Sequence, residues 1–60
     1  MKQYDKVCLT MDYTFYAKGT IGIIKDIFNN EYCYLDLLDD NNEVLTTLYD
    51  VPLEVLSLVD

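Results

Sequence analysis

The sequence predicts a single all-β domain of about five short strands. Its 60 residues are 52% hydrophobic and 25% charged, a composition typical of folded rather than disordered chains. Short runs of alternating apolar and polar residues are separated by Gly, Asn, Asp and Pro turn signals. Helices over residues 32–38 and 53–58 are the alternative, because Leu and Glu favour helix. Segments this short would form only marginal helices, so strands are favoured.

The first strand is expected over residues 6–11, where every second residue is apolar. We expect its odd-numbered side chains to face the core: Val7, Leu9 and Met11. A long loop with three aromatic residues follows over residues 12–18. It ends at Gly19, whose lack of a side chain permits a positive φ.

The second strand is expected over about residues 20–28, a segment rich in Ile. Its internal Gly22 predicts a bulge or a sharp bend, as at the corner of a barrel. The next turn is expected at Asn29 and Asn30, because Asn tolerates the left-handed region. The third strand is then expected over residues 31–38.

The third strand has two different faces. The apolar face is expected to be buried: Cys33, Leu35 and Leu37. The opposite face carries a charged residue and is expected to be exposed: Tyr32, Tyr34, Asp36 and Leu38. Because alternation points Cys33 inward and Cys8 outward, two free thiols are expected rather than a disulfide. Two Cys and no His are too few ligands for a tetrahedral zinc site within one chain.

The run Asp39–Asn42 is the strongest turn signal in the chain and predicts a hairpin. The fourth strand is expected over residues 43–49. Its pattern leaves the buried face open, with a slight preference for Val44, Thr46 and Leu48. Pro52 with an acidic residue ahead of it favours one turn of 3₁₀ helix, and a short last strand is expected over residues 55–59.

This order of elements resembles that of small SH3-like barrels. Residues 19–24 resemble the G-x-x-G-x-V corner of KOW-type barrels. Over nearly the whole chain, further residues match the pattern of an uncharacterised bacterial family of small SH3-like domains: Asp5, Val7, Leu9, Gly19, Gly22, Ile24, Leu35, Asp36, Leu37, Asp39, Thr47, Leu48 and Leu53. The chain departs from that pattern at Asn42, where the family has a turn Gly, and at Ile23, where it has Thr.

The resemblance implies a five-stranded SH3-like barrel with one short 3₁₀ turn before the last strand, forming one domain over residues 1–60. It implies no known activity. Small proteins of this kind are sometimes encoded near bacterial toxins.

The net charge of −7 arises from eleven acidic and four basic residues. Nucleic-acid binding is disfavoured, because it depends on Lys and Arg to neutralise phosphates. An enzyme is not expected, since His and Arg are absent and so short a chain rarely encloses a substrate pocket. No cofactor or metal is expected. The first residues lack a signal-peptide pattern and no apolar run could span a membrane, so a cytoplasmic protein is expected.

Six Tyr and two Phe are many for so short a chain, and Tyr is enriched at protein interfaces. We therefore expect a small acidic protein-binding module that docks a basic partner, such as an inhibitor or immunity-type protein acting on a bacterial toxin or nuclease. The candidate interface rings are Tyr13, Phe15, Tyr16, Tyr32 and Tyr34. The candidate interface carboxylates are Asp36, Asp39, Asp40, Glu43, Asp50 and Glu54.

Two other functions stay open. One is a homo-oligomeric structural or regulatory subunit, because an open strand edge invites pairing. The other is KOW-like binding of RNA or the ribosome, in which exposed rings would stack on bases.

Overall fold

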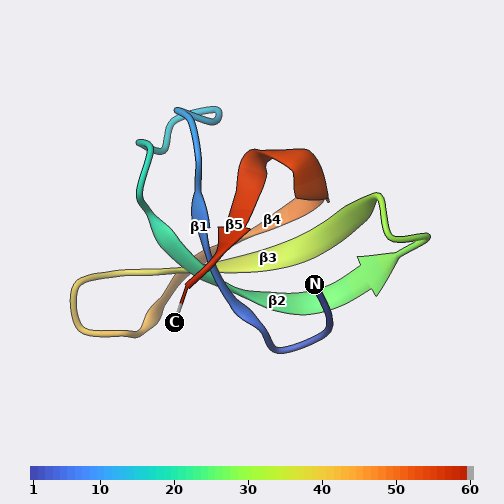
Figure 1. Cartoon of the computed structure of the whole chain (residues 1–60). Coiled ribbons are helices and arrows are strands. Elements are labelled where there is room, and N and C mark those ends of the chain that lie inside the picture. Colours follow the sequence, from blue (N-terminus) through green and yellow to red (C-terminus); the bar gives the residue numbers. More distant parts are fainter. Residues whose placement is uncertain (60) are drawn as a thin grey trace.

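The computed structural model describes residues 1–59 and shows five antiparallel strands in one sheet (Figure 1). The elements are β1 (Lys6–Leu9), β2 (Ile21–Phe28), β3 (Tyr32–Leu38), β4 (Val44–Pro52), a 3₁₀ turn η1 (Leu53–Val55) and β5 (Leu56–Leu58). The strand order across the sheet is β4-β3-β2-β1-β5, so the last strand returns to pair with the first. The all-β prediction is confirmed. The sheet is open, because within the described residues β4 does not pair with β5. No helix in this part of the chain is long and apolar enough to cross a membrane.

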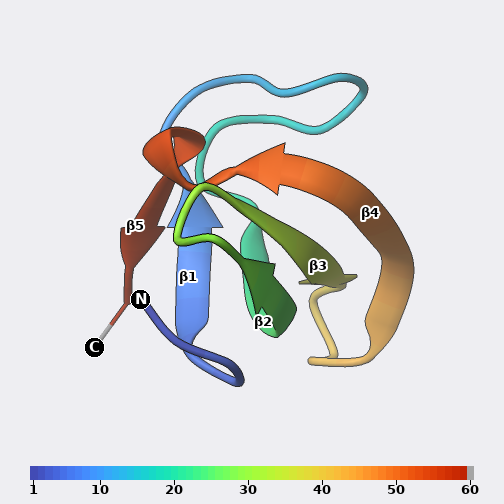
Figure 2. The ribbon, with the colours of Figure 1, turned by 90° about the vertical axis from the view of Figure 1, so that its right-hand side faces the viewer.

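The sheet curls around one apolar core, with β4 as its most curved strand (Figure 2). The core consists of Val7, Leu9, Ile24, Cys33, Leu35, Leu37, Val51, Val55 and Leu56. Five partly buried side chains pack against it: Tyr13, Tyr16, Ile27, Leu48 and Leu53. The core therefore draws on every strand, on η1 and on the long loop.

β1 ends at Leu9, two residues earlier than predicted. Val7 and Leu9 are buried as predicted, but the prediction for Met11 is wrong, because its side chain is 50% exposed. The reason lies at Thr10, whose backbone N–H and hydroxyl both donate to the carbonyl oxygen of Val55, at 2.9 and 3.0 Å. The chain turns toward η1 at this point, and Met11 falls in the loop.

In β2 the predicted bulge is displaced. The pairing of β2 with β3 shifts between Ile24 and Asp26, not at Gly22. Gly22 instead allows β2 to pack closely against β3. A Cβ at this position would lie 2.9 Å from Leu35 Cδ1 and 3.1 Å from the carbonyl oxygen of Asp36. The interruption of the Ile pattern after Ile24 is thus the sequence signal of the bulge.

The turn between β2 and β3 is as predicted. Asn29 and Asn30 have φ values of 53° and 55°, and the backbone N–H of Glu31 donates to the carbonyl oxygen of Phe28 at 3.0 Å. Two consecutive residues with positive φ match the right-handed twist of the strands that they join. The predicted faces of β3 are also confirmed, since Cys33, Leu35 and Leu37 are fully buried and the alternate residues are partly or well exposed.

β4 runs three residues further than predicted, and its preferred buried set is only partly correct. Leu48 packs against the core, but Val44 is 58% exposed. In the pairing with β3, the one residue between Cys33 and Leu35 faces the two residues between Leu48 and Val51. The extra residue lets Leu48 and Val51 both face the core although they are three positions apart. Simple alternation could not reveal this.

The chain then enters η1 through Pro52, as predicted, and β5 covers Leu56–Leu58, the middle of the predicted last strand. The backbone N–H of Leu53 donates to the carbonyl oxygen of Glu31 at 2.9 Å. This bond ties η1 to the turn between β2 and β3, while the bonds from Thr10 tie it to the end of β1.

Candidate functional site

The long loop between β1 and β2 is held by hydrogen bonds along its length. Tyr13 and Tyr16 form an isolated bridge, with N–H to carbonyl distances of 2.8 and 3.0 Å in the two directions. Asp12 Oδ1 accepts a hydrogen bond from the backbone N–H of Lys18 at 2.9 Å. At its end Gly19 has φ 91°, as predicted, and its N–H donates to the carbonyl oxygen of Leu9 at 2.8 Å. Hydrogen bonds therefore hold the loop, and with it its aromatic residues, in a hairpin-like conformation.

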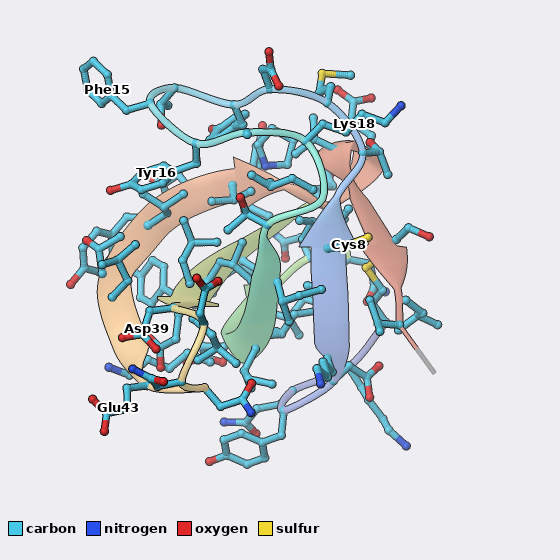
Figure 3. The ribbon with its side chains drawn as sticks, turned by 90° about the vertical axis from the view of Figure 1, so that its left-hand side faces the viewer. Cys8, Phe15, Tyr16, Lys18, Asp39 and Glu43 are labelled. Carbon is cyan, nitrogen blue, oxygen red and sulfur yellow. The ribbon has the colours of Figure 1, made fainter. Side chains whose placement is uncertain are left out.

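The rings of this loop have different surroundings. Tyr13 and Tyr16 are partly buried and pack against the core. Phe15 lies at the tip of the loop, points away from the sheet and is 97% exposed (Figure 3). Phe15 therefore adds an exposed apolar surface next to Tyr16.

The turn between β3 and β4 is organised by one carboxylate. Asp39 Oδ1 accepts hydrogen bonds from the backbone N–H groups of Asn41 and Glu43, at 2.8 and 3.0 Å. The backbone of Asp39 also pairs with Glu43 and Asn42, and Asn42 has φ 62°. Asp40 follows at the exposed corner of this turn. Asp39 thus shapes the turn, and Asp40 is free to serve another role.

Between this loop and this turn lies an open groove of about 530 Å³. Its lining comes from three places: Tyr16, Gly19 and Thr20 from the loop, Asp39, Asp40 and Asn42 from the turn, and Ile21, Leu38 and Leu45 from β2, β3 and β4. Figure 3 faces this region, with Tyr16 on one side of it and Asp39 on the other. The groove therefore combines one ring, two carboxylates and three aliphatic side chains from distant parts of the sequence.

The structure brings together only some of the predicted interface residues. Tyr16, Asp39 and Asp40 line the groove, with Phe15 next to Tyr16 on the loop and Glu43 at the end of the turn. The other six predicted residues lie elsewhere: Tyr13, Tyr32, Tyr34, Asp36, Asp50 and Glu54.

A second hollow, of about 390 Å³, lies beside η1. It is lined by Asn30, Glu31, Tyr32, Pro52, Leu53 and Glu54. Tyr32 and Glu54 thus share a surface with each other but line no part of the groove.

The remaining predicted residues make local contacts. The half-buried carboxylate of Asp36 accepts a hydrogen bond from the hydroxyl of Thr47 at 2.6 Å, which links β3 to β4. Asp50 sits in the β4 irregularity with φ 55°. Tyr34 stands between Phe28 and Tyr49, with ring centroids 4.8 and 4.9 Å apart in edge-to-face geometry.

Sequence reasoning missed the aliphatic part of the groove and the two rings that contact Tyr34, which are Phe28 and Tyr49. Ile21, Leu38 and Leu45 look like ordinary strand residues, and only the curl of the sheet brings them together. Phe28 and Tyr49 could have been found, because Phe28 ends β2 before the Asn29–Asn30 turn and Tyr49 precedes Asp50 at the β4 irregularity. Their ring contacts with Tyr34 could be predicted only with knowledge of the strand register.

Both cysteines are free thiols, and their orientations are as predicted, with Cys33 buried and Cys8 only partly so. Burial raises the pKa of the Cys33 thiol to about 11, since the thiolate would lose its hydration. Cys33 is therefore an inert part of the core. Over residues 1–59 no three His, Cys, Asp or Glu side chains are arranged to hold a metal ion.

Comparisons with protein-family models, with curated proteins and with solved structures give no match to this chain.

Proposed function

We propose that this chain is a small SH3-like barrel that binds a basic partner protein through the groove between its long loop and its β3–β4 turn. The strand order supports the barrel, as do the long first loop and the 3₁₀ turn before the last strand. So do the hydrogen bonds that tie η1 to β1 and to the β2–β3 turn, because they hold the connection between the edge strands β4 and β5 against the rest of the sheet.

The observation that carries the proposed function is the composition of the groove. Tyr16, Asp39 and Asp40 surround three aliphatic side chains at one open depression. A Lys or Arg side chain matches such a surface, because its aliphatic stem packs on apolar groups while its charged end meets carboxylates. The net charge of −7 also attracts a basic partner over a distance.

The specific form we favour is an inhibitor or immunity-type protein that plugs a basic toxin or nuclease. Two features support it: the acidic surface and the resemblance to small bacterial SH3-like domains. The free thiols Cys8 and Cys33 suit the reducing cytoplasm, where such an inhibitor would act.

A homo-oligomeric subunit ranks second. In its favour, the side of β4 away from β3 forms no backbone hydrogen bond within the described residues. Against it, β4 is interrupted by two register shifts and β5 has only three residues, and both features hinder edge-to-edge pairing. KOW-like RNA binding ranks third, because carboxylates in the groove repel phosphates.

The test is affinity capture from native cell lysate with three baits: the wild type, Asp40→Lys and Glu54→Lys. Both variants change the net charge by the same two units, at the groove and at the second hollow respectively. We avoid Asp39, because its carboxylate holds the turn. Bound proteins are quantified by mass spectrometry at low and at moderate salt.

We expect one basic protein that the wild type and Glu54→Lys retain and that Asp40→Lys loses, with weaker capture at moderate salt. A fourth bait, Leu45→Ala, is added to these three and should also weaken the capture, because Leu45 supplies exposed apolar surface to the groove. Equal capture by all baits, or loss of capture only with Glu54→Lys, would show that the interface lies outside the groove. Capture of no basic protein, with the chain itself eluting as a dimer, would favour the second-ranked function.

A further inference from the structure

A three-ring aromatic cluster covers the outer face of the sheet at the end opposite to the groove. Its rings come from three adjacent strands: Phe28 from β2, Tyr34 from β3 and Tyr49 from β4. None of them belongs to the core or packs against it. Tyr49 is 65% exposed and Phe28 is 36% exposed, so the outer rings of the cluster stand in water. Edge-to-face contacts between rings on neighbouring strands stabilise a sheet. This stabilisation does not depend on the exposure of the rings, so the exposed ring surface is also available for binding.

The cluster and the groove lie on one continuous face. Along β3, Tyr34, Asp36 and Leu38 alternate with the buried Cys33, Leu35 and Leu37 and so point to the same side. Tyr34 belongs to the cluster and Leu38 to the groove. Leu38 lies four positions after Tyr34 along the strand, which corresponds to about 13 Å.

Acidic residues accompany the rings along this face. Asp26 pairs with Tyr34 across β2 and β3, and Asp36 lies between the cluster and the groove. β3 and β4 contain no Lys, and the chain has no Arg. The face therefore offers exposed rings and carboxylates, and neither β3 nor β4 contributes a cation to it.

We propose that this outer face docks an extended, arginine-bearing segment of the basic partner, an inference that rests on the proposed function. The aromatic cluster takes a guanidinium group, and the groove takes a second basic side chain. A guanidinium group is planar and weakly hydrated, so it can stack on a ring while its N–H groups reach a carboxylate. An extended segment covers the 13 Å span in about four residues, so the two basic side chains are four positions apart.

The experiment is a titration of the ¹⁵N-labelled protein at low ionic strength, followed by two-dimensional NMR. The first probe is the blocked pentapeptide acetyl-Arg-Gly-Ser-Gly-Arg-amide. The second replaces both arginines by lysine, and the third keeps only one arginine. We expect the first probe to shift the amide signals around Tyr34 and Tyr49 together with those of Asp40 and Leu45. Its dissociation constant should be about three- to fivefold lower than that of the lysine probe.

The matched variants are Tyr49→Ala, Tyr49→Phe and Tyr4→Ala. Tyr4 is also well exposed but lies before β1, outside the outer face. Tyr49→Ala should weaken binding of the first probe about three- to fivefold, whereas Tyr49→Phe keeps a ring and should retain most of the affinity. Tyr4→Ala should bind as the wild type does. Dispersed amide spectra establish that each variant is folded.

Shifts at the groove without shifts at the cluster would overturn this inference and leave the proposed function standing. Equal binding of the arginine and lysine probes, or no effect of Tyr49→Ala, would also overturn it. Shifts at neither site would count against both the inference and the groove.

Discussion

At the residue scale, Gly19 and Gly22 are required for different physical reasons. Gly19 has a positive φ and open space around its Cα, so its constraint is backbone conformation. Gly22 lies where β2 passes closest to β3, and its constraint is the space taken by Leu35 and by the backbone of Asp36. A sequence pattern shows both glycines but does not distinguish the two reasons.

This difference predicts that the two glycines respond differently to substitution. Gly22→Ala should lower the free energy of unfolding by about 1–3 kcal/mol, because the core has no room for the added methyl group. Gly19→Ala should cost about 1 kcal/mol, and Gly19→Asn should recover part of it, since Asn tolerates the left-handed region. Urea denaturation measures each value. A tolerated Gly22→Ala would show that Leu35 can move aside.

Cys33 gives the molecule a pH dependence at alkaline pH. The folded-state pKa of its thiol is about 11, against 9.0 for an unperturbed thiol. The unfolded chain therefore loses this proton first, so the stabilising contribution is complete below pH 9 and is lost as the pH rises toward 11. The expected loss by pH 11 is on the order of 2 kcal/mol.

The measurement is urea denaturation between pH 8 and 11 for the wild type and Cys33→Val. Tyr and Lys side chains titrate in both proteins, so only the difference between the two pH profiles reports on the thiol. The variant should lose less stability than the wild type over this range. Parallel profiles would mean that the Cys33 thiol ionises as easily in the folded protein as in the unfolded chain.

At the element scale, the β3–β4 turn assigns different roles to two neighbouring carboxylates. Asp39 accepts two backbone hydrogen bonds within the turn, whereas Asp40 is exposed at its corner. Asp39→Ala should therefore lower the free energy of unfolding by about 1 kcal/mol, and Asp40→Ala should leave it nearly unchanged. Thermal denaturation of both variants tests this. Equal destabilisation would mean that Asp40 also supports the turn, and the Asp40→Lys bait would then need a stability control.

The irregularity of β4 is a second property of an element. Asp50 adopts φ 55° at the position where β4 gains one residue over β3. Asp50→Gly should keep or raise stability by up to about 1 kcal/mol, whereas Asp50→Val should lower it by about 1–2 kcal/mol, because a β-branched residue resists positive φ. Chemical denaturation of both variants provides the measurement. A neutral Asp50→Val would indicate that the bulge can relocate along β4.

At the scale of the whole molecule, the excess of carboxylates opposes the compact state. The net charge is −7 on a chain of 60 residues, and repulsion among these charges is weakened by salt. We expect the melting temperature to rise by about a few degrees between low salt and physiological ionic strength. Calorimetry across a NaCl series measures this, with Asp40→Lys expected to show a smaller rise. A melting temperature that is independent of salt would mean that the charges are too far apart to repel.

Four features follow from the amino-acid sequence alone: the all-β class, the Asn29–Asn30 turn, the buried face of β3 and the 3₁₀ turn after Pro52. Each of these is a local property, because it depends on the alternation of apolar and polar residues, on residues that favour turns or on the fixed φ of proline. The sequence also identified rings and carboxylates as the residues of interest, but it could not sort them into the groove, the second hollow and the aromatic cluster.

The tertiary structure decided that sorting, because it depends on register and on the curl of the sheet. The bulge in β2, the extra residue in β4 and the outward turn of the chain at Thr10 all arise from pairing with residues far away in the sequence. The same long-range pairing brings Tyr16 to Asp39 and Asp40, and Tyr34 to Phe28 and Tyr49. The alternation of apolar and polar residues has a period of two along a single strand. It therefore does not reveal which strand pairs with that strand, or where a bulge shifts the register by one residue.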